Sequence, residues 1–296
     1  MKKHLDFIVI GAQKSGTTSL FRYLRKHPAI FLPPAKEIPF FSEDVYFEHG
    51  FEWFLTEFFG SADPNHLWGT VTPSYMANLD SAKRIHDTIP NVKLVAILRN
   101  PIHRAMSHYQ MTYKRGIEDR QLTVALDNLL EPEHIISARK IRSFTVESEK
   151  CCYLAWGEYG RIIQYYRQFF PKNQIHILFY DDLAARPGYT LDSVLSFLGL
   201  KAGFRPSNLG KQYFKGGSRN RIPRLTRMAE MVSVGLPFRY RSALMLWLEV
   251  VNTVPEEIND VCLSVDLRRK LRDFYRPDIS LFEKISGMKT PWSEFL

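Results

Sequence analysis

FIVIGAQKSGTTS, residues 7–19, decides the fold of this chain. The apolar run at 7–10 meets Gly11 and is followed by a loop and a helix-like stretch to Lys26, so a strand, a loop and a helix are expected in that order. Two glycines at this spacing are typical of a loop that binds phosphate through its backbone N–H groups and the following helix N-terminus. A tight packing turn is the alternative explanation.

The lysine of this loop stands in an unusual place. A nucleotide kinase or GTPase carries lysine directly after the second glycine, but Thr17 occupies that position here and Lys14 lies three residues earlier. A second apolar run, residues 92–98, ends in Arg99 rather than in the aspartate that helps to hold Mg²⁺ in nucleotide hydrolases. Metal-assisted phosphoryl transfer is therefore disfavoured.

Further segments repeat the alternation of strand and helix. After residues 92–98, Asn100 suits an N-cap, Pro101 suits the first helical position and Gly116 closes the helix. A helix-like run at 157–170, a strand-like run at 174–180 and a helix-like run at 187–198 then follow one another. Short apolar strands between helices predict an α/β fold with a P-loop-type central parallel sheet that helices cover on both faces.

The composition indicates one domain over residues 1–296. With 45% apolar and 14% aromatic residues, the chain is long enough to bury a large core. Residues 117–150 and 205–260 are expected to form long loops, with helices, over the substrate side of an active site. Residues 266–287 are typical of a closing amphipathic helix, interrupted near Pro277.

Charge and cysteine content limit the binding partners and the cellular compartment that are expected for this chain. Lys and Arg outnumber Asp and Glu by 40 to 31, a formal net charge of +9, which favours an anionic ligand. The basic residues are spread along the chain, so nucleic acid is not expected as a partner. The cysteines Cys151 and Cys152 are neighbours, and no secretory leader or membrane span is visible, so we expect a reducing, cytoplasmic location and no membrane partner. The oligomeric state is left open.

Several motifs together resemble the sulfotransferases, and most closely the heparan sulfate N- and 3-O-sulfotransferases. They are GAQKSGTT at 11–18, KEIPFF at 36–41, TPSY at 72–75 and LRNP at 98–101 with Ser107. The likeness continues through GFEWF at 50–54, GEY at 157–159 and QIHIL at 174–178. It implies in-line transfer of the sulfuryl group of 3'-phosphoadenosine 5'-phosphosulfate (PAPS) to a hydroxyl or amine of a small-molecule or glycan acceptor, without a metal.

The resemblance also implies roles for individual residues. Lys14 would bind the 5'-phosphosulfate and assist catalysis, together with Ser15, Gly16, Thr17, Thr18 and Ser19. Arg99 and Ser107 would hold the 3'-phosphate, and a late cofactor loop would contain Lys215, Gly216, Gly217 and Ser218. Glu37 would be the catalytic base, and the acceptor would be bound by Lys36, Phe41, Thr72 and Tyr75.

Other interpretations stay open on sequence alone. Glu37 can instead form an ion pair with Lys36, and His103 or His108 can serve as the base because imidazole titrates near neutral pH. A P-loop nucleotide kinase or NTPase, or a non-catalytic module that binds anions, would share the opening loop. The missing anchor favours an enzyme of secondary metabolism over a glycan-modifying enzyme of the Golgi, and the acceptor is not identified.

Overall fold

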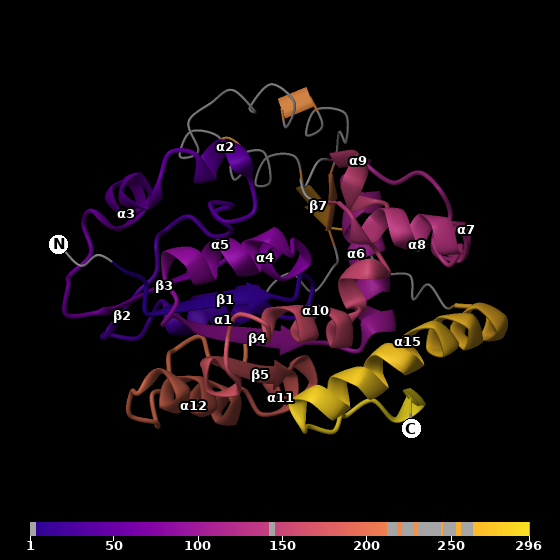
Figure 1. Cartoon of the computed structure of the whole chain (residues 1–296). Coiled ribbons are helices and arrows are strands. Elements are labelled where there is room, and N and C mark those ends of the chain that lie inside the picture. Colours follow the sequence, from indigo (N-terminus) through magenta and orange to yellow (C-terminus); the bar gives the residue numbers. More distant parts are fainter. Residues whose placement is uncertain are drawn as a thin grey trace.

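A computed structural model describes residues 4–141, 146–211, 218–220, 228–229, 244, 253–255 and 263–295. Its centre is a five-stranded parallel sheet with the order β2-β3-β1-β4-β5 (Figure 1). The strands are β1 (Phe7–Gly11), β2 (Ile30–Phe31), β3 (Leu67–Val71), β4 (Lys93–Leu98) and β5 (Ile175–Phe179). The expected α/β fold with a central parallel sheet is confirmed.

Helices cover both faces of the sheet, as Figure 1 shows. One face carries α4 (Ser74–Ala77), α5 (Asp80–Thr88) and α10 (Tyr159–Tyr166), and the other carries α1 (Thr17–Leu24), α11 (Tyr180–Ala185) and α12 (Pro187–Leu198). The other described helices are α2 (Asp44–Phe47), α3 (Phe51–Phe59), α6 (Pro101–Lys114), α7 (Leu122–Asn128), α8 (Pro132–Arg139), α9 (Val146–Glu149) and α15 (Val265–Ser286). Short 3₁₀ turns are η1 (Ala155–Gly157), η2 (Lys172–Gln174) and η4 (Ser293–Phe295).

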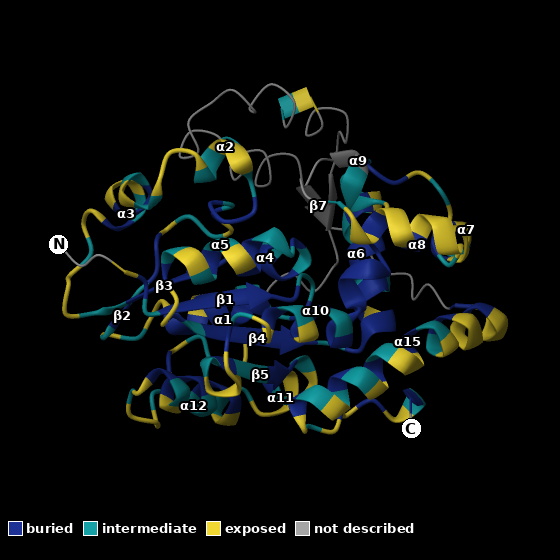
Figure 2. Ribbon diagram, in the orientation of Figure 1, coloured by how far each residue is buried: buried dark blue, intermediate teal, exposed yellow. Residues whose placement is uncertain are grey.

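Alternate residues of the central strands enter two separate cores. Ile8 and Leu94 pack with α4 and α5, whereas Phe7 and Val95 pack with α1 and α12. Both central strands are therefore buried from both sides, and they are dark blue in Figure 2. This double burial explains why each strand is a continuous apolar run rather than an alternating one.

The helix signals after β4 are confirmed. The Asn100 side chain accepts the N–H groups of Ile102 (3.0 Å) and His103 (3.2 Å), Pro101 begins α6, and Gly116 has a φ of +71° just beyond its end. The predicted strand at 174–180 and helix at 187–198 are β5 and α12. The first helix ends at Leu24 rather than Lys26, and the run at 157–170 divides into η1 and α10.

Two strands of the sheet were not predicted. β2 has two residues, and β3 contains Gly69, which weakens a strand on its own. The glycine is needed because a Cβ there would lie 2.3 Å from the ring of Phe7. Packing between strands, rather than local propensity, therefore selects β3.

The two expected loop regions contain regular secondary structure. Residues 117–150 contain helices α7, α8 and α9, which connecting segments separate, and their proposed place on the substrate side stays a prediction. Of residues 205–260, the described part includes 205–211 and a two-stranded antiparallel pair, β6 (Ser218–Asn220) and β7 (Thr253–Pro255); the rest of that prediction lies outside the described residues. Among the described helices, none combines the length and apolar character needed to cross a membrane.

The expected interruption near Pro277 was also wrong, because α15 runs unbroken from Val265 to Ser286. A proline inside a helix costs about 3 kcal/mol or more. Burial of Leu271, Tyr275 and Phe282 on one side of α15 offsets that cost. The helix therefore packs along α10 in one piece.

Candidate functional site

The loop between β1 and α1 lies at the carboxyl edge of the sheet, where parallel α/β sheets bind their ligands. Gly11 ends the strand beneath α4, and a Cβ on it would lie 2.6 Å from the Cβ of Met76. Gly16 takes a left-handed conformation (φ +90°) immediately before Thr17, the first residue of α1. The first N–H groups of a helix lack intrahelical partners, so this turn directs them out of the end of α1 toward an anion.

Lys14 supplies the cation of this loop. Its backbone is also left-handed (φ +69°), and among the described residues its ammonium has no ion-pair partner within 4 Å. Burial lowers the pKa of Lys14 to about 8; Glu37 opposes this shift, and Arg99 adds to it. The loop therefore holds a half-buried positive charge that Glu37 offsets only in part.

Arg99 joins the loop from the neighbouring strand end. Its Nη1 donates to the backbone oxygen of Lys14 (3.2 Å), and its guanidinium lies over the ring of Tyr180, 4.8 Å from the ring centre. Among the described residues, no other hydrogen bond of the guanidinium is formed, so its remaining N–H groups could bind a phosphate-like anion. Ser107 lies on α6, roughly 9 Å along the helix axis from Pro101 by helical rise.

Glu37 lies on the segment between β2 and α2. Its backbone is left-handed (φ +66°), and its N–H donates to the carbonyl of Val71 at the end of β3 (3.0 Å). The carboxylate contacts the ammonium of Lys36, and 53% of the Glu37 side chain is exposed. The strand end of β3 therefore fixes the backbone of the predicted base.

Charge keeps this carboxylate ionised. Burial raises the pKa of Glu37, but the opposing effects of Lys36, Lys14 and Arg115 are larger together, so its pKa falls below the ordinary value of 4.5. At neutral pH the group can accept a proton but cannot donate one. The ion pair with Lys36 is present as well, so the two interpretations of Glu37 are compatible.

Three predicted acceptor ligands lie in the core instead. Phe41, Thr72 and Tyr75 are completely buried. The hydroxyls of Thr72 (3.1 Å) and Tyr75 (2.5 Å) both donate to the carbonyl of Ile38, the residue after Glu37. Their polar groups are used to hold the segment that carries Glu37, so of the predicted acceptor residues Lys36 remains partly accessible, with 16% of its side chain exposed.

The two alternative bases differ in accessibility. His103 is exposed on α6, and burial of its ring lowers its pKa. His108 is completely buried, stacks on Trp156 and meets Tyr153 edge-on, and burial lowers its pKa well below 6.5. His108 is therefore a neutral core residue that cannot reach an acceptor in this conformation.

Sequence reasoning gave no role to two residues at this site. Tyr159 is completely buried with its hydroxyl on the backbone of Arg99, and the motif GEY at 157–159 was its only signal. Arg115 follows α6 and pairs with Glu149 (3.0 Å), and its charge acts on Lys14 and Glu37. The predicted residues Lys215, Gly216 and Gly217 lie outside the described residues, and Ser218 begins β6.

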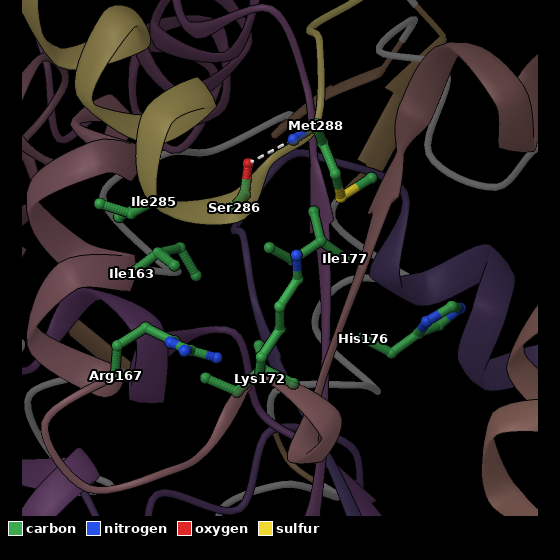
Figure 3. Close-up of a pocket in the computed structure, with 9 residues that line it drawn as sticks. Ile163, Arg167, Lys172, His176, Ile177, Ile285, Ser286 and Met288 are labelled. Atoms are coloured by element: carbon green, nitrogen blue, oxygen red, sulfur yellow. Dashed lines mark hydrogen bonds between the residues drawn. The ribbon is translucent and has the colours of Figure 1, made fainter.

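A separate pocket of about 260 Å³ lies elsewhere (Figure 3). It is lined at the beginning of β5 and near the end of α15, by Ile163, Arg167, Lys172, Ile175, His176, Ile177, Ile285, Ser286 and Met288. The strand pairing sets Ile175 beside Leu94, whereas Phe179 pairs with Leu98 next to Arg99. This pocket is therefore at the opposite edge of the sheet from the loop and takes no part in the site.

Comparison with known proteins identifies the family to which this chain belongs. Residues 4–231 match the model of the sulfotransferase domain. The chain belongs to the sulfotransferase family. This sulfotransferase is 27% identical to a membrane-associated sulfotransferase of Dictyostelium discoideum, with 69% of this chain and 59% of that protein covered. It is 31% identical to the bifunctional heparan sulfate N-deacetylase/N-sulfotransferase 1 of Caenorhabditis briggsae (67% and 23% covered) and 27% identical to human heparan sulfate glucosamine 3-O-sulfotransferase 6 (66% and 52% covered).

Solved structures agree on the fold. A sulfotransferase from Alicyclobacillus acidocaldarius superposes with a TM-score of 0.68 at 21% identity, covering 97% of both chains. A mouse sulfotransferase complexed with PAP superposes with a TM-score of 0.51 at 16% identity, covering 96% of this chain and 89% of that one. The resemblance to the heparan sulfate enzymes and the expectation of a transferase are confirmed, which sets aside the kinase and the non-catalytic module.

Proposed function

We propose that this sulfotransferase moves the sulfuryl group of PAPS to a hydroxyl or amine of a small-molecule or glycan acceptor. The main support for the proposal is that three charged side chains lie near one another. Lys14 is in the loop, and Arg99 is hydrogen-bonded to that loop. Glu37 is ionised, and its charge and that of Lys14 shift each other's pKa. A cationic cradle beside a general base is what transfer from an anionic donor to a weakly acidic nucleophile requires.

The residues present fit such a donor. When bound, PAPS supplies an activated sulfuryl group and a stable leaving phosphate. Lys14, the hydroxyls of Thr17, Thr18 and Ser19, and the first N–H groups of α1 would bind its 5' end, while Arg99 and Ser107 would bind its 3'-phosphate. Among the described residues no group of three His, Cys, Asp or Glu is arranged to hold a metal, and that no metal takes part remains a prediction.

Glu37 and Lys14 share the chemistry in this proposal. Glu37 accepts the proton of the attacking hydroxyl or amine, and Lys14 neutralises the charge that develops on the leaving phosphate oxygen. Lys36 holds the carboxylate in place through their ion pair. We assign Phe41, Thr72 and Tyr75 the task of positioning this segment rather than contacting the acceptor.

The wider setting of the enzyme is also part of the proposal. We propose that residues 1–296 act as one domain, because Trp292 near the end of the chain packs against Tyr159 and Phe179. Cys151 and Cys152 are neighbours in the chain, which makes an ordinary disulfide between them improbable, and we propose a reducing, cytoplasmic location together with a role in secondary metabolism. Nucleic acid and membrane are not proposed as partners; cell fractionation would test this, since one relative is membrane-associated.

Calorimetry and a transfer assay test the donor. We expect wild-type protein to bind 3'-phosphoadenosine 5'-phosphate (PAP) and to transfer labelled sulfuryl from PAPS to at least one member of a panel of phenols, alcohols, amines and oligosaccharides, with EDTA present. Lys14→Ala should lose transfer, while Lys172→Ala, at the opposite edge of the sheet, should keep it. Absence of PAP binding by folded wild-type protein would refute the proposed donor.

A further inference from the structure

The segment 290–295, which follows α15, is held beside the carboxyl ends of β4 and β5. Helix α15 ends at Ser286, and Gly287 takes a left-handed conformation (φ +70°), after which the chain turns back along the helix (Figure 1). The carboxylate of Glu283 accepts both the N–H (3.0 Å) and the hydroxyl (3.1 Å) of Thr290. These bonds fix the beginning of the segment to the last turn of α15.

Trp292 of this segment is buried among the neighbours of Arg99. Its Nε1 donates to the carboxylate of Asp181 (3.2 Å), and its ring packs against that of Tyr159, with 6.0 Å between the ring centres. Tyr159 donates its hydroxyl to the carbonyl of Arg99 (2.8 Å). Tyr180, the residue before Asp181, carries the Arg99 guanidinium over its ring. Trp292 therefore contacts a residue that holds the backbone of Arg99 and the neighbour of a residue that holds its guanidinium.

Glu294 contacts the residue that follows Arg99. The side-chain amide of Asn100 donates to Oε1 of Glu294, while the side-chain oxygen of Asn100 accepts two of the first N–H groups of α6. Arg268 of α15 donates to the other carboxylate oxygen, Oε2 (3.4 Å). Asn100 is buried, so removal of Glu294 would leave its N–H group without this acceptor. Glu294 therefore orients the amide that caps α6 directly beside Arg99.

We propose that Glu294 and Trp292 are positioning residues that hold Arg99 in place for the 3'-phosphate of the donor. The proposal rests on the proposed function, because that function assigns the 3'-phosphate to Arg99. Ligands with a 3'-phosphate then depend on the segment 290–295, whereas a ligand with a 5'-phosphate alone depends on the loop after β1. A carboxylate that acted only through its charge would repel the donor, so the two possible effects of Glu294 differ in sign.

Glu294→Ala tests the proposal through ligands with one or two phosphates. We expect the Kd for PAP and for adenosine 3'-phosphate to rise about tenfold, because the buried amide of Asn100 loses its acceptor. The Kd for adenosine 5'-phosphate should change less than threefold. In turnover, KM for PAPS should rise while kcat changes little. Glu294→Gln is the matched control: it removes the charge but keeps an oxygen acceptor, so it should bind all three ligands within threefold of wild-type protein.

A double-mutant cycle tests whether Glu294 acts through Arg99. In an Arg99→Ala background the positioned group is absent, so Glu294→Ala should change the Kd for PAP less than threefold. Trp292→Phe examines the second residue, because it keeps an aromatic ring and loses the N–H donor. Its matched control is Trp68→Phe: this indole is also buried and donates to a backbone carbonyl, that of Asp63 (2.8 Å), at the beginning of β3. Trp292→Phe should weaken PAP and adenosine 3'-phosphate, and Trp68→Phe should weaken neither.

The outcomes separate this inference from the proposed function. No PAP binding by folded wild-type protein would overturn both. If wild-type protein binds PAP, the inference alone is overturned when Glu294→Ala leaves all three ligands unchanged or weakens them equally. Tighter PAP binding by both Glu294 variants, or an undiminished loss in the Arg99→Ala background, would also overturn it. If Glu294→Ala does not fold, Trp292→Phe decides: selective loss of the two 3'-phosphate ligands supports the inference, and any other pattern contradicts it.

Discussion

Asp278 gives a prediction about stability that does not depend on the reaction. Burial is the largest influence on its carboxyl group and raises the pKa from 3.8 to about 6, despite the two N–H groups of Gly160 and Arg161 that it accepts. Because the folded state binds this proton more tightly than the unfolded state, the favourable contribution is complete below pH 3.8 and is lost as the pH rises through 6. The full difference is about 3 kcal/mol at 1.36 kcal/mol per pKa unit.

Urea unfolding of wild-type protein and Asp278→Asn across pH 4.5–7.5 measures this contribution. About 2 kcal/mol of it falls in that range, so the stability of wild-type protein should decline by about 2 kcal/mol relative to the variant as the pH rises. A constant difference in the free energy of unfolding between wild-type protein and the variant is expected, because the asparagine amide presents one oxygen where the carboxylate has two. The test is therefore the slope of that free energy against pH.

Asp273→Asn, an exposed change on the same helix, should follow the wild-type slope. All other titrating groups are common to these proteins and cancel in the comparison. If Asp278→Asn shows the same dependence on pH as wild-type protein, then Asp278 is not a buried, proton-binding carboxylate, and the rigid attachment of α10 to α15 loses its main support.

Three further predictions concern the functional site and the contact between α10 and α15. Because the pKa of Lys14 is about 8, kcat/KM for PAPS should fall about tenfold per pH unit above pH 8, and a profile flat to pH 9.5 would contradict a required ammonium. Glu37→Gln should lower kcat by about 10²–10⁴ while PAP still binds in calorimetry; unchanged turnover would exclude the base. Gly160→Ala should cost about 1–3 kcal/mol in urea unfolding because its Cβ would meet the backbone of α15, whereas Gly188→Ala, which faces the flexible side chain of Arg205, should be nearly neutral.

The sequence was most informative where structure is set locally. The run at 7–19 predicted β1, the loop and α1, and Asn100, Pro101 and Gly116 predicted both ends of α6, because caps and left-handed glycines act over a few residues. β3 was missed because Gly69 is a weak strand former whose value lies in making room for Phe7. The continuous helix through Pro277 was missed because packing of α15 on α10, rather than the local sequence, keeps the helix unbroken.

In the functional site, too, some features could be predicted from the sequence and others could not. Motifs identified Lys14, Arg99 and Glu37, whose roles stay predictions until the kinetics above are measured. Motifs could not tell that Thr72 and Tyr75 use their hydroxyls inside the protein, because both bonds reach Ile38 more than 30 residues away. Contacts of that kind depend on the packed structure and leave no periodic pattern in the chain.

The displaced lysine has a consequence for the stability of the free enzyme. Arg99, Lys36 and Arg115 each lower the pKa of Lys14, so these cations repel Lys14 when no anion is bound, and Glu37 offsets part of that repulsion. Lys14 also holds a left-handed backbone that favours glycine. Both features raise the free energy of the unliganded loop, and binding of an anionic donor would relieve the electrostatic part. The residues that we propose to bind an anionic donor would therefore make the unliganded protein less stable than its core alone would allow.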